Sequence, residues 1–450
     1  MSIFLKGNKM KFIKTLAIIA ICSMLLVACS GGDDNKEVLK YDEVTKSTLG
    51  KNKGKEPKTG IGFDGKEISL GIITPQTGNA GFLGNAIKSG SQTYWDSKNN
   101  TGGVAGKYRV ALIDEDSAAN GTYDKALSIS AYDKLSPKVV AFQHVLGTDV
   151  VLALKDRQLK DTKLVMPATL ASSFVRDPLT VPITNAYPTQ AINGIGYYLE
   201  STVVEKPVIC SLSLDDTYGD DSNKGVEYAT KKLGVKYGTA QKFTTGSSVS
   251  SQVDAIVASK CNAVVFAGTA IDIKVVLEAF ASKASDVDVI GLSPAWIPQV
   301  DLNLTSASKT YAAEHFYIVS AGAKWGDTSV PGMDKMMEDV ANFKPNQISN
   351  PFFMFGYAQA WAMDQILEEA VKNGDLSPAG VAKALSNINT FDFEGLIPSY
   401  EYGPNTSSRV VPNSNTIFVY SLEDKSKLVP VSNDSIDYIN AYTPGFKYTK

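Results

Sequence analysis

The side chains that could do chemistry in this sequence are few and poorly clustered. Asp114, Glu115 and Asp116 stand together at the end of an expected strand, where carboxylates could bind a cation or transfer protons. Such a run is more often a solvated loop between a strand and a helix, and we favour that interpretation. The chain has 2 histidines, His144 and His315, and 4 cysteines, an inventory that argues against a zinc site.

Sequence motifs of common enzymes are absent from the chain. There is no G-x-S-x-G nucleophile elbow, no Walker phosphate loop, no H-E-x-x-H pair and no C-x-x-C pair. A net charge of −3 argues against a nucleic-acid partner. These observations favour a binding protein over an enzyme, and we expect no cofactor and no resident metal.

The first 29 residues have the order of a bacterial lipoprotein signal. Four lysines give a positive start: Lys6, Lys9, Lys11 and Lys14. The uncharged run 15–28 is too short for a membrane span of roughly 20 residues but suits a signal peptide. It ends in Leu26-Val27-Ala28-Cys29, so we expect residues 1–28 to be removed and Cys29 to be lipidated. An uncleaved helical anchor is the alternative, and Met10 is an alternative start.

Residues 29–65 are expected to form a flexible tether, because they are rich in Gly, Lys, Asp and Asn. The folded body should begin near Glu67. This order predicts an extracytoplasmic protein, anchored by lipid to a bacterial membrane. In a host with two membranes, Ser30 after the lipidated cysteine favours the outer membrane; the periplasmic face of the inner membrane is the alternative.

Short β-rich runs alternate with longer amphipathic runs from Glu67 onward. This alternation predicts an α/β fold with parallel sheets flanked by helices. The rhythm restarts near Gln190, which predicts two lobes and a ligand cleft between them. The carboxyl-terminal third begins two helices, at Asn350-Pro351 and Ser377-Pro378, and then ends in hairpin-like runs at 397–402 and 416–420.

An ordered set of short motifs resembles the branched-chain amino-acid-type solute-binding proteins of ABC importers. The set spans about residues 67–420 and comprises Ile72–Ala80, Gly84, Gly90, Asn99–Lys107, Val165–Thr169, Asp216–Gly219, Ala263–Gly268 and Phe355–Ala358. Asn79 replaces the proline of the family's first ligand loop. The resemblance implies a type I periplasmic-binding-protein fold, with two Rossmann-like lobes joined by a three-crossover hinge. Lobe 1 is expected at 66–188 and 318–392, and lobe 2 at 189–317 and 393–450.

The resemblance also implies where ligand contacts should lie. From lobe 1 they are Thr77, Phe82, Leu83, Thr148 beside Gly147, Ala168 and Thr169. From lobe 2, Tyr218 matches the tyrosine that covers the ligand in this family. Each threonine could instead be a cap or turn hydroxyl, and Tyr218 could be a packed loop aromatic.

One departure from the family bears on the ligand. Amino-acid binders of this family usually carry a carboxylate after a lobe 2 strand, where it pairs with the ligand ammonium. The matching segment 292–296 has no acid. Trp296 could stack on the ligand or pack in the hinge, and Asp272, one loop earlier, could replace the missing acid. An amino acid, an amide, a urea-like compound, a carboxylate and an aromatic acid all remain open.

The leading interpretation is a lipid-anchored solute-binding protein of an ABC importer, which captures a small polar ligand as its two lobes close. Its expected partners are the ligand, the ABC permease subunits and the membrane, and we expect a monomer. A sensing receptor without transport is one alternative. An exported enzyme that uses the cleft, with Asp114 or Asp216, is another.

Cys210 and Cys261 belong to an exported protein, in which a disulfide is permitted. Cys210 sits inside an expected strand and Cys261 just before another. We therefore favour two separate buried thiols over a bond, with the pairing left open.

The lipoprotein signal in residues 1–29 predicts that Cys29 carries the lipid anchor. A Cys29→Ala protein should lose incorporation of a lipid label and should leave the membrane fraction, because the thiol is the site of acylation. Metabolic labelling followed by fractionation measures both. A variant that stays on the membrane without label would contradict the prediction.

Overall fold

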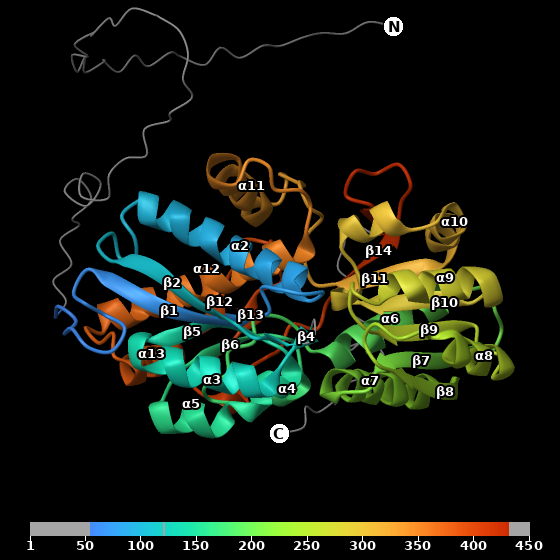
Figure 1. Cartoon of the computed structure of the whole chain (residues 1–450), viewed down its shortest axis with the longest axis horizontal. Coiled ribbons are helices and arrows are strands. Elements are labelled where there is room, and N and C mark those ends of the chain that lie inside the picture. Colours follow the sequence, from blue (N-terminus) through green and yellow to red (C-terminus); the bar gives the residue numbers. More distant parts are fainter. Residues whose placement is uncertain (1–54, 120–121, 432–450) are drawn as a thin grey trace, which may run out of the picture. The chain divides into compact units, whose positions relative to one another are not determined.

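The computed structural model describes residues 55–119 and 122–431 of the 450-residue chain. The expected signal peptide, Cys29 and residues 30–54 of the expected tether lie outside these described residues. Within the described ranges, every helix is too short or too polar to cross a membrane. Two sheets, each flanked by helices, organise this part of the chain into lobes 1 and 2 (Figure 1).

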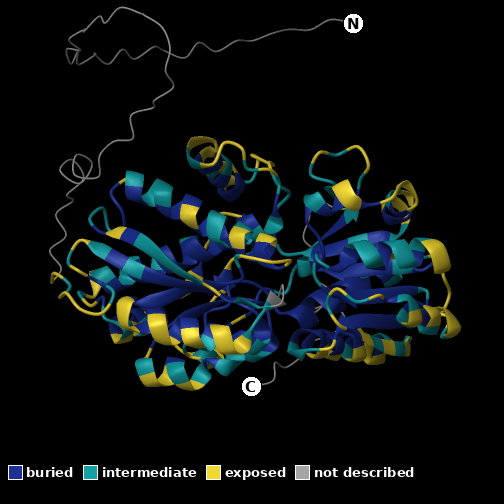
Figure 2. Cartoon of the chain, in the orientation of Figure 1, coloured by how far each residue is buried: buried dark blue, intermediate teal, exposed yellow. Residues whose placement is uncertain are grey.

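Lobe 1 is built on a parallel sheet. Its strands, in spatial order, are β2 (Arg109–Asp116), β1 (Glu67–Thr74), β5 (Ala141–Leu146) and β6 (Val165–Ala168). Every residue of β5 is buried, as expected for a parallel strand covered on both faces (Figure 2). In register, Leu70 of β1 lies beside Leu112 of β2 and Ala141 of β5.

Helices cover both faces of the lobe 1 sheet with separate buried clusters. One cluster joins the sheet to α2 (Gly81–Asn100), α11 (Pro331–Phe343), α12 (Pro351–Lys372) and α13 (Pro378–Ala384). The other joins it to α3 (Lys125–Leu135) and α4 (Thr148–Ala153), after which comes α5 (Lys155–Asp161). Two small hairpins complete the lobe: β3 (Ala118–Ala119) with β4 (Thr122–Tyr123), and β12 (Thr390–Phe391) with β13 (Tyr400–Glu401).

Two glycines let α2 and α12 cross in direct backbone contact. A Cβ atom on Gly90 would lie 1.9 Å from the carbonyl oxygen of Phe353, and one on Gly356 would lie 1.9 Å from that of Ile87. Both approaches are far inside van der Waals contact, so only glycine fits. The crossing brings Ile87 of α2 beside the first turns of α12.

Lobe 2 is built on a larger, mixed sheet. In spatial order its strands are β15 (Leu428–Pro430), β14 (Thr416–Tyr420), β11 (Phe316–Ser320), β10 (Asp288–Leu292), β9 (Ala263–Ala267), β7 (Val208–Leu214) and β8 (Lys236–Phe243). The strands from β11 to β8 run parallel to one another. β14 pairs antiparallel with β11, and β15 pairs antiparallel with β14.

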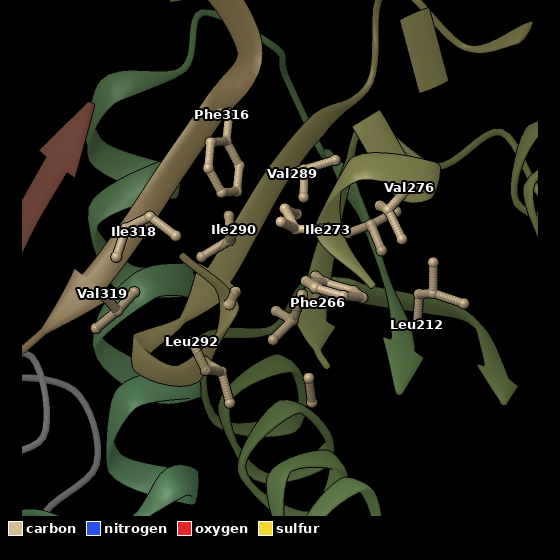
Figure 3. Close-up of a cluster of buried hydrophobic side chains, with 14 of the residues drawn as sticks. Leu212, Phe266, Ile273, Val276, Val289, Ile290, Leu292, Phe316, Ile318 and Val319 are labelled. Atoms are coloured by element: carbon tan, nitrogen blue, oxygen red, sulfur yellow. The ribbon is translucent and has the colours of Figure 1, made fainter. Parts of the chain in front are cut away.

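The helices of lobe 2 share one large apolar core with this sheet. They are α6 (Tyr187–Ser201), α7 (Thr217–Leu233), α8 (Ser250–Ala258), α9 (Ile273–Lys283) and α10 (Ser306–His315). Figure 3 shows part of this core, where Ile273 and Val276 of α9 lie over Phe266 of β9 and Val289 of β10.

Two of the expected boundaries between the lobes, at residues 317 and 392, differ from those in the structure. β11 lies in the lobe 2 sheet through Ser320, so the chain leaves lobe 2 after that residue rather than at 317. Phe393, Tyr400 and Val411 are buried in the lobe 1 cluster, so lobe 1 extends to about residue 411 rather than 392. The β-like run near residue 400 pairs within lobe 1, through β12 and β13.

The described end of the expected tether belongs to lobe 1. Phe63 is 3% exposed and its ring meets that of Tyr108 edge-on, with 5.1 Å between centroids. The Glu56 carboxylate accepts hydrogen bonds from Lys107 and from the Tyr108 hydroxyl. The folded body therefore begins before residue 66.

Cys210 and Cys261 form a disulfide bond, which corrects the expectation of two separate thiols. Their Cα atoms are 5.9 Å apart although 51 residues separate them. The reason is topological, because β7 and β9 are neighbours in the sheet and Cys261 lies just before β9. A bond between adjacent parallel strands requires spatial order that sequence spacing alone does not reveal.

Candidate ligand-binding site

A cavity of about 80 Å³ lies where the two lobes meet, beside the carboxyl ends of β6, β10 and β11. In open α/β sheets this end of the strands is the usual place for a ligand. The walls come from both lobes: Ala168, Thr169, Leu170, Thr184, Tyr187, Ser293, Pro294, Ser320, Ala321, Gly322, Pro351, Phe352, Met354, Phe355, Ile87 and Ile397. None of these lining residues is an acid, a lysine, an arginine or a histidine.

The start of α12 is fixed in this wall by the signal that the sequence carries. The Asn350 side chain accepts hydrogen bonds from the backbone N–H groups of Phe352 and Phe353, as an N-cap does. Pro351 follows at the first helical position. These two features fix the residue at which α12 begins. Phe352 and Phe355, in its first turns, line the cavity.

A chain of hydroxyl groups and rings connects lobe 1 to lobe 2 behind the cavity. The Thr169 Oγ1 atom lies 2.6 Å from Thr148 Oγ1 and 3.1 Å from the Tyr187 hydroxyl. The Tyr187 ring packs on that of Tyr218, with 4.3 Å between centroids. The Tyr218 hydroxyl then donates to the Gly268 carbonyl at 3.2 Å. The structure thus brings Thr148, Thr169 and Tyr218 together.

Tyr187 and Tyr218 are neutral hydrogen-bonding groups at ordinary pH. Burial raises the pKa of Tyr187 to about 12. Burial also raises the pKa of Tyr218 well above its ordinary value, and Tyr218 is 5% exposed. Tyr218 is therefore a packed support behind the cavity wall, which it does not itself line.

Two direct contacts hold the lobes together at the edge of the cleft. The Asp221 carboxylate of α7 accepts hydrogen bonds from Ser172 N at 2.7 Å and from Ser172 Oγ at 2.6 Å. The Thr217 hydroxyl of the same helix donates to Asp149 of α4. Burial raises the pKa of Asp221 above its ordinary value, while the bonds from Ser172 oppose that shift.

Three expected contacts of the first lobe 1 loop lie away from the cavity. Thr77 donates its hydroxyl hydrogen to Asp116 at 2.7 Å, which is the turn role. Phe82 is 38% exposed and lines a separate surface hollow with Ile271 and Lys274. Leu83 is buried in the apolar cluster that also contains Ile87, Ala168 and Leu170.

Asp272 and Trp296 also lie outside this cavity. The Asp272 carboxylate accepts hydrogen bonds from Gly246 N at 2.9 Å and Thr269 Oγ1 at 3.1 Å, so it joins two loops of lobe 2. Trp296 is fully buried, packs on Phe316 and Tyr420, and lines an adjoining cavity of about 50 Å³. Asp272 therefore supplies no carboxylate to the first cavity, and Trp296 does not line it.

The carboxylates of Asp114 and Asp116 in β2 already have hydrogen-bonding and ion-pairing partners within the protein. Asp114 pairs with Lys88 at 2.8 Å and accepts from Gln76 Nε2 at 2.8 Å. Asp116 accepts from Gln76 N and from the Thr77 hydroxyl. Both carboxylates thus fix the loop after β1.

Several lining residues were not predicted from the sequence. Thr184 and Tyr187 come from the first crossing between lobes, Ser293 and Ser320 from strand ends, and Phe352 from α12. The Asn350-Pro351 helix start is the one signal near them, and apolar side chains at a helix start carry no sign that they line a cavity.

A family comparison identifies the architecture that holds this cavity. The family model of periplasmic binding proteins matches residues 67–421. The chain belongs to this family. The predicted family and the predicted α/β fold class with two lobes are thereby confirmed.

Solved structures of the family share the fold at low sequence identity. A fatty acid ABC transporter substrate-binding protein from Thermomonospora curvata gives a TM-score of 0.78 at 23% identity, covering 87% of this chain and 97% of that chain. A branched-chain amino acid ABC transporter protein from Thermus thermophilus with bound valine gives 0.71 at 15%, covering 85% and 100%. A substrate-binding periplasmic protein from Ralstonia solanacearum gives 0.70 at 19%, covering 81% and 99%. No curated protein matches the sequence.

The Asp221–Ser172 contact predicts a measurable effect on lobe association. Asp221→Ala leaves two Ser172 donors without their acceptor when the lobes meet, at a cost of about 1–3 kcal/mol. The equilibrium should shift toward separated lobes by roughly 5- to 150-fold. Fluorescence transfer between dyes on α3 and α8 measures the shift.

Two matched variants make this result specific. Asp254→Asn should change nothing, because Asp254 pairs with Lys283 within lobe 2. Asp221→Asn keeps a side-chain oxygen that can accept from Ser172, so it should shift the equilibrium less than Asp221→Ala does. Unchanged lobe association in Asp221→Ala would contradict the role.

Proposed function

We propose that the protein is a solute-binding receptor of an ABC importer, held outside the cytoplasm by lipid on Cys29. The observation that carries the proposal is the cavity between the lobes, lined by strand ends of both sheets and by the start of α12. A ligand in that place contacts both lobes at once. It therefore binds more strongly when the lobes are together, and this difference is what drives closure.

The ligand contacts proposed from the sequence divide into two groups. Ala168 and Thr169 line the cavity and are proposed as direct contacts, with Leu83 behind the apolar wall. Thr148 and Tyr218 are proposed as positioning residues, because they act through Thr169 and Tyr187. We do not assign a ligand contact to Thr77, Phe82 or Asp272; Trp296 could reach a ligand only from the adjoining cavity that it lines.

The Thr169 hydroxyl has the capacity to bind a ligand as well as its neighbours. A hydroxyl provides one donor and two acceptor lone pairs. If Thr148 and Tyr187 both donate to Thr169, its own hydrogen is free for a ligand acceptor. This arrangement supports Thr169 as the polar contact of lobe 1.

Turnover of the bound molecule is not part of the proposal. The residues that line the cavity include no carboxylate, histidine, cysteine or lysine that could pair with a serine or threonine as a base. The names of the neighbours from Thermomonospora curvata and Thermus thermophilus support a transport role with a small ligand. Permease subunits are the proposed partners, and the receptor is proposed to act as a monomer.

A ligand screen tests the proposed function. Thermal unfolding of the purified mature protein with amino acids, amides, ureas and carboxylates should reveal a stabilising compound. At about 100 times its dissociation constant, a ligand adds about 2.7 kcal/mol. Uptake of that compound should then require this protein in cells; binding without uptake would indicate a sensor. Consumption of the compound at about 1–1000 per second would overturn the proposal.

Thr169→Val should weaken ligand binding and also lower the stability of the free protein. The lost hydrogen bond costs roughly 10- to 150-fold in affinity if the ligand group is charged, and less if it is neutral. Stability falls because Thr148 and Tyr187 lose their common partner. Calorimetry measures the affinity, and thermal unfolding of the ligand-free protein measures the stability.

Thr77→Val provides the control for this substitution. It removes the same hydroxyl from a turn outside the cavity, so affinity should stay unchanged. Equal losses of affinity in both variants would contradict the placement of the site at Thr169.

A further inference from the structure

The chemistry of the cavity wall restricts the ligand more sharply than the family does. Six large apolar side chains form most of the wall: Ile87, Leu170, Phe352, Met354, Phe355 and Ile397. They come from α2, the loop after β6, α12 and the segment after β12. Such a wall favours a ligand body that is itself apolar and compact.

No carboxylate is available to pair with a ligand ammonium in this cavity. The nearby acids of lobe 2 already serve other groups. Asp272 accepts from Gly246 and Thr269, Asp221 accepts from Ser172, and Asp216 caps α7 through Gly219 N at 2.9 Å. None of these acids lines the cavity. A buried ammonium without an opposite charge costs several kcal/mol.

The polar atoms that lack partners in this region include suitable donors. Thr184 lines the cavity, is 4% exposed, and its Oγ1 has no hydrogen-bond partner within the described part of the chain. Trp296 Nε1 lacks a partner in the same sense and belongs to the adjoining cavity. The two cavities share Ser293, Ser320, Pro351 and Met354 as walls.

Both groups can donate a hydrogen bond to a ligand oxygen. An indole N–H only donates, so it suits a carbonyl or carboxylate oxygen and cannot bind an ammonium. A hydroxyl donates equally well to such an oxygen. A buried donor without a partner is costly, and a ligand acceptor would remove that cost.

We infer that the ligand is a compact, largely apolar molecule that carries a carbonyl or carboxylate acceptor and lacks an ammonium group. This inference rests on the proposed function and names the ligand class of the same cavity. It excludes the free α-amino acids that the family resemblance would favour. The Thr184 hydroxyl and the Trp296 indole bind the acceptor end, and the apolar wall encloses the body.

Three compounds with one carbon skeleton test the inference. They are L-leucine, 4-methylpentanoate and 4-methylpentanamide, which differ only in the ammonium group and in the charge of the acceptor. Isothermal titration of the mature protein should show the carboxylate, the amide or both binding at least 10-fold more tightly than leucine. Leucine binding as tightly as the tighter-binding analogue would overturn the inference, and so would binding of none of the three.

The same titrations separate this inference from the proposed function. If leucine or another amino acid binds and uptake depends on the protein, the receptor function stands and the inference fails. If neither these compounds nor those of the wider screen bind, both fail. Tight binding of an analogue without its ammonium supports both.

Two variants locate the acceptor end of the bound analogue. Thr184→Val keeps the shape and removes a hydroxyl that no group in residues 55–119 or 122–431 uses, so melting of the free protein should not fall. Affinity should drop roughly 3- to 10-fold for the amide, the value of one neutral hydrogen bond, and roughly 10- to 150-fold for the charged carboxylate. Trp296→Phe should cause a similar loss. Thr328→Val, on an exposed loop, is the control and should change nothing. Unchanged affinity in both cavity variants would overturn the assigned acceptor contacts.

Discussion

A buried cluster of three asparagines ties together the three places where the chain passes between lobes. Asn185 belongs to the first crossing, and Asn415 to the third. The Asn415 Oδ1 atom accepts from Asn185 at 2.9 Å and from Asn193 of α6 at 2.8 Å. Its Nδ2 group donates to the carbonyl of Ser320, at the second crossing, at 3.2 Å. Because an unpaired buried amide is costly, this network favours keeping the three crossings together.

The position of the cavity follows from that junction. Thr184 and Tyr187 flank Asn185, and Ser320 ends β11, so the crossings themselves supply cavity walls. The Gly90–Gly356 approach then seats α12 against α2 and brings Phe352 to the opposite wall. Hydrogen bonds at the crossings and the close packing of α2 against α12 therefore together position the residues that line the cavity.

Local sequence patterns predicted the parts of the fold that depend on local rules. Alternating strand and helix runs gave both sheets, and Asn350-Pro351 marked the start of α12. The third crossing was misplaced because the run near Tyr400 has β character but no sign of which sheet it joins. The same limit applies to Cys210 and Cys261, whose bond depends on β7 and β9 being neighbours.

The site was predictable where hydroxyl groups follow strands, and less so elsewhere. Thr169 follows β6 and Thr148 begins α4, so the family pattern located both. Phe352 looked like a core residue, because apolar side chains at a helix start carry no mark of a cavity. Asp272 looked like a ligand carboxylate, yet its oxygens are used by Gly246 and Thr269. Burial and partner identity separate such cases, and neither can be read from one sequence.

The contact between Asp221 and Ser172 combines opposing effects, and this bears on how the receptor responds to ligand. Two hydrogen bonds favour the contact, whereas burial of the carboxylate disfavours it. Burial raises the pKa of Asp221 although the bonds from Ser172 oppose that shift, so desolvation of the ionised carboxylate offsets part of what the bonds contribute. The contact therefore accounts for only part of the association of the lobes. A ligand can shift a two-state equilibrium only by its difference in affinity for the two states, and that difference arises in the cavity, which both lobes line.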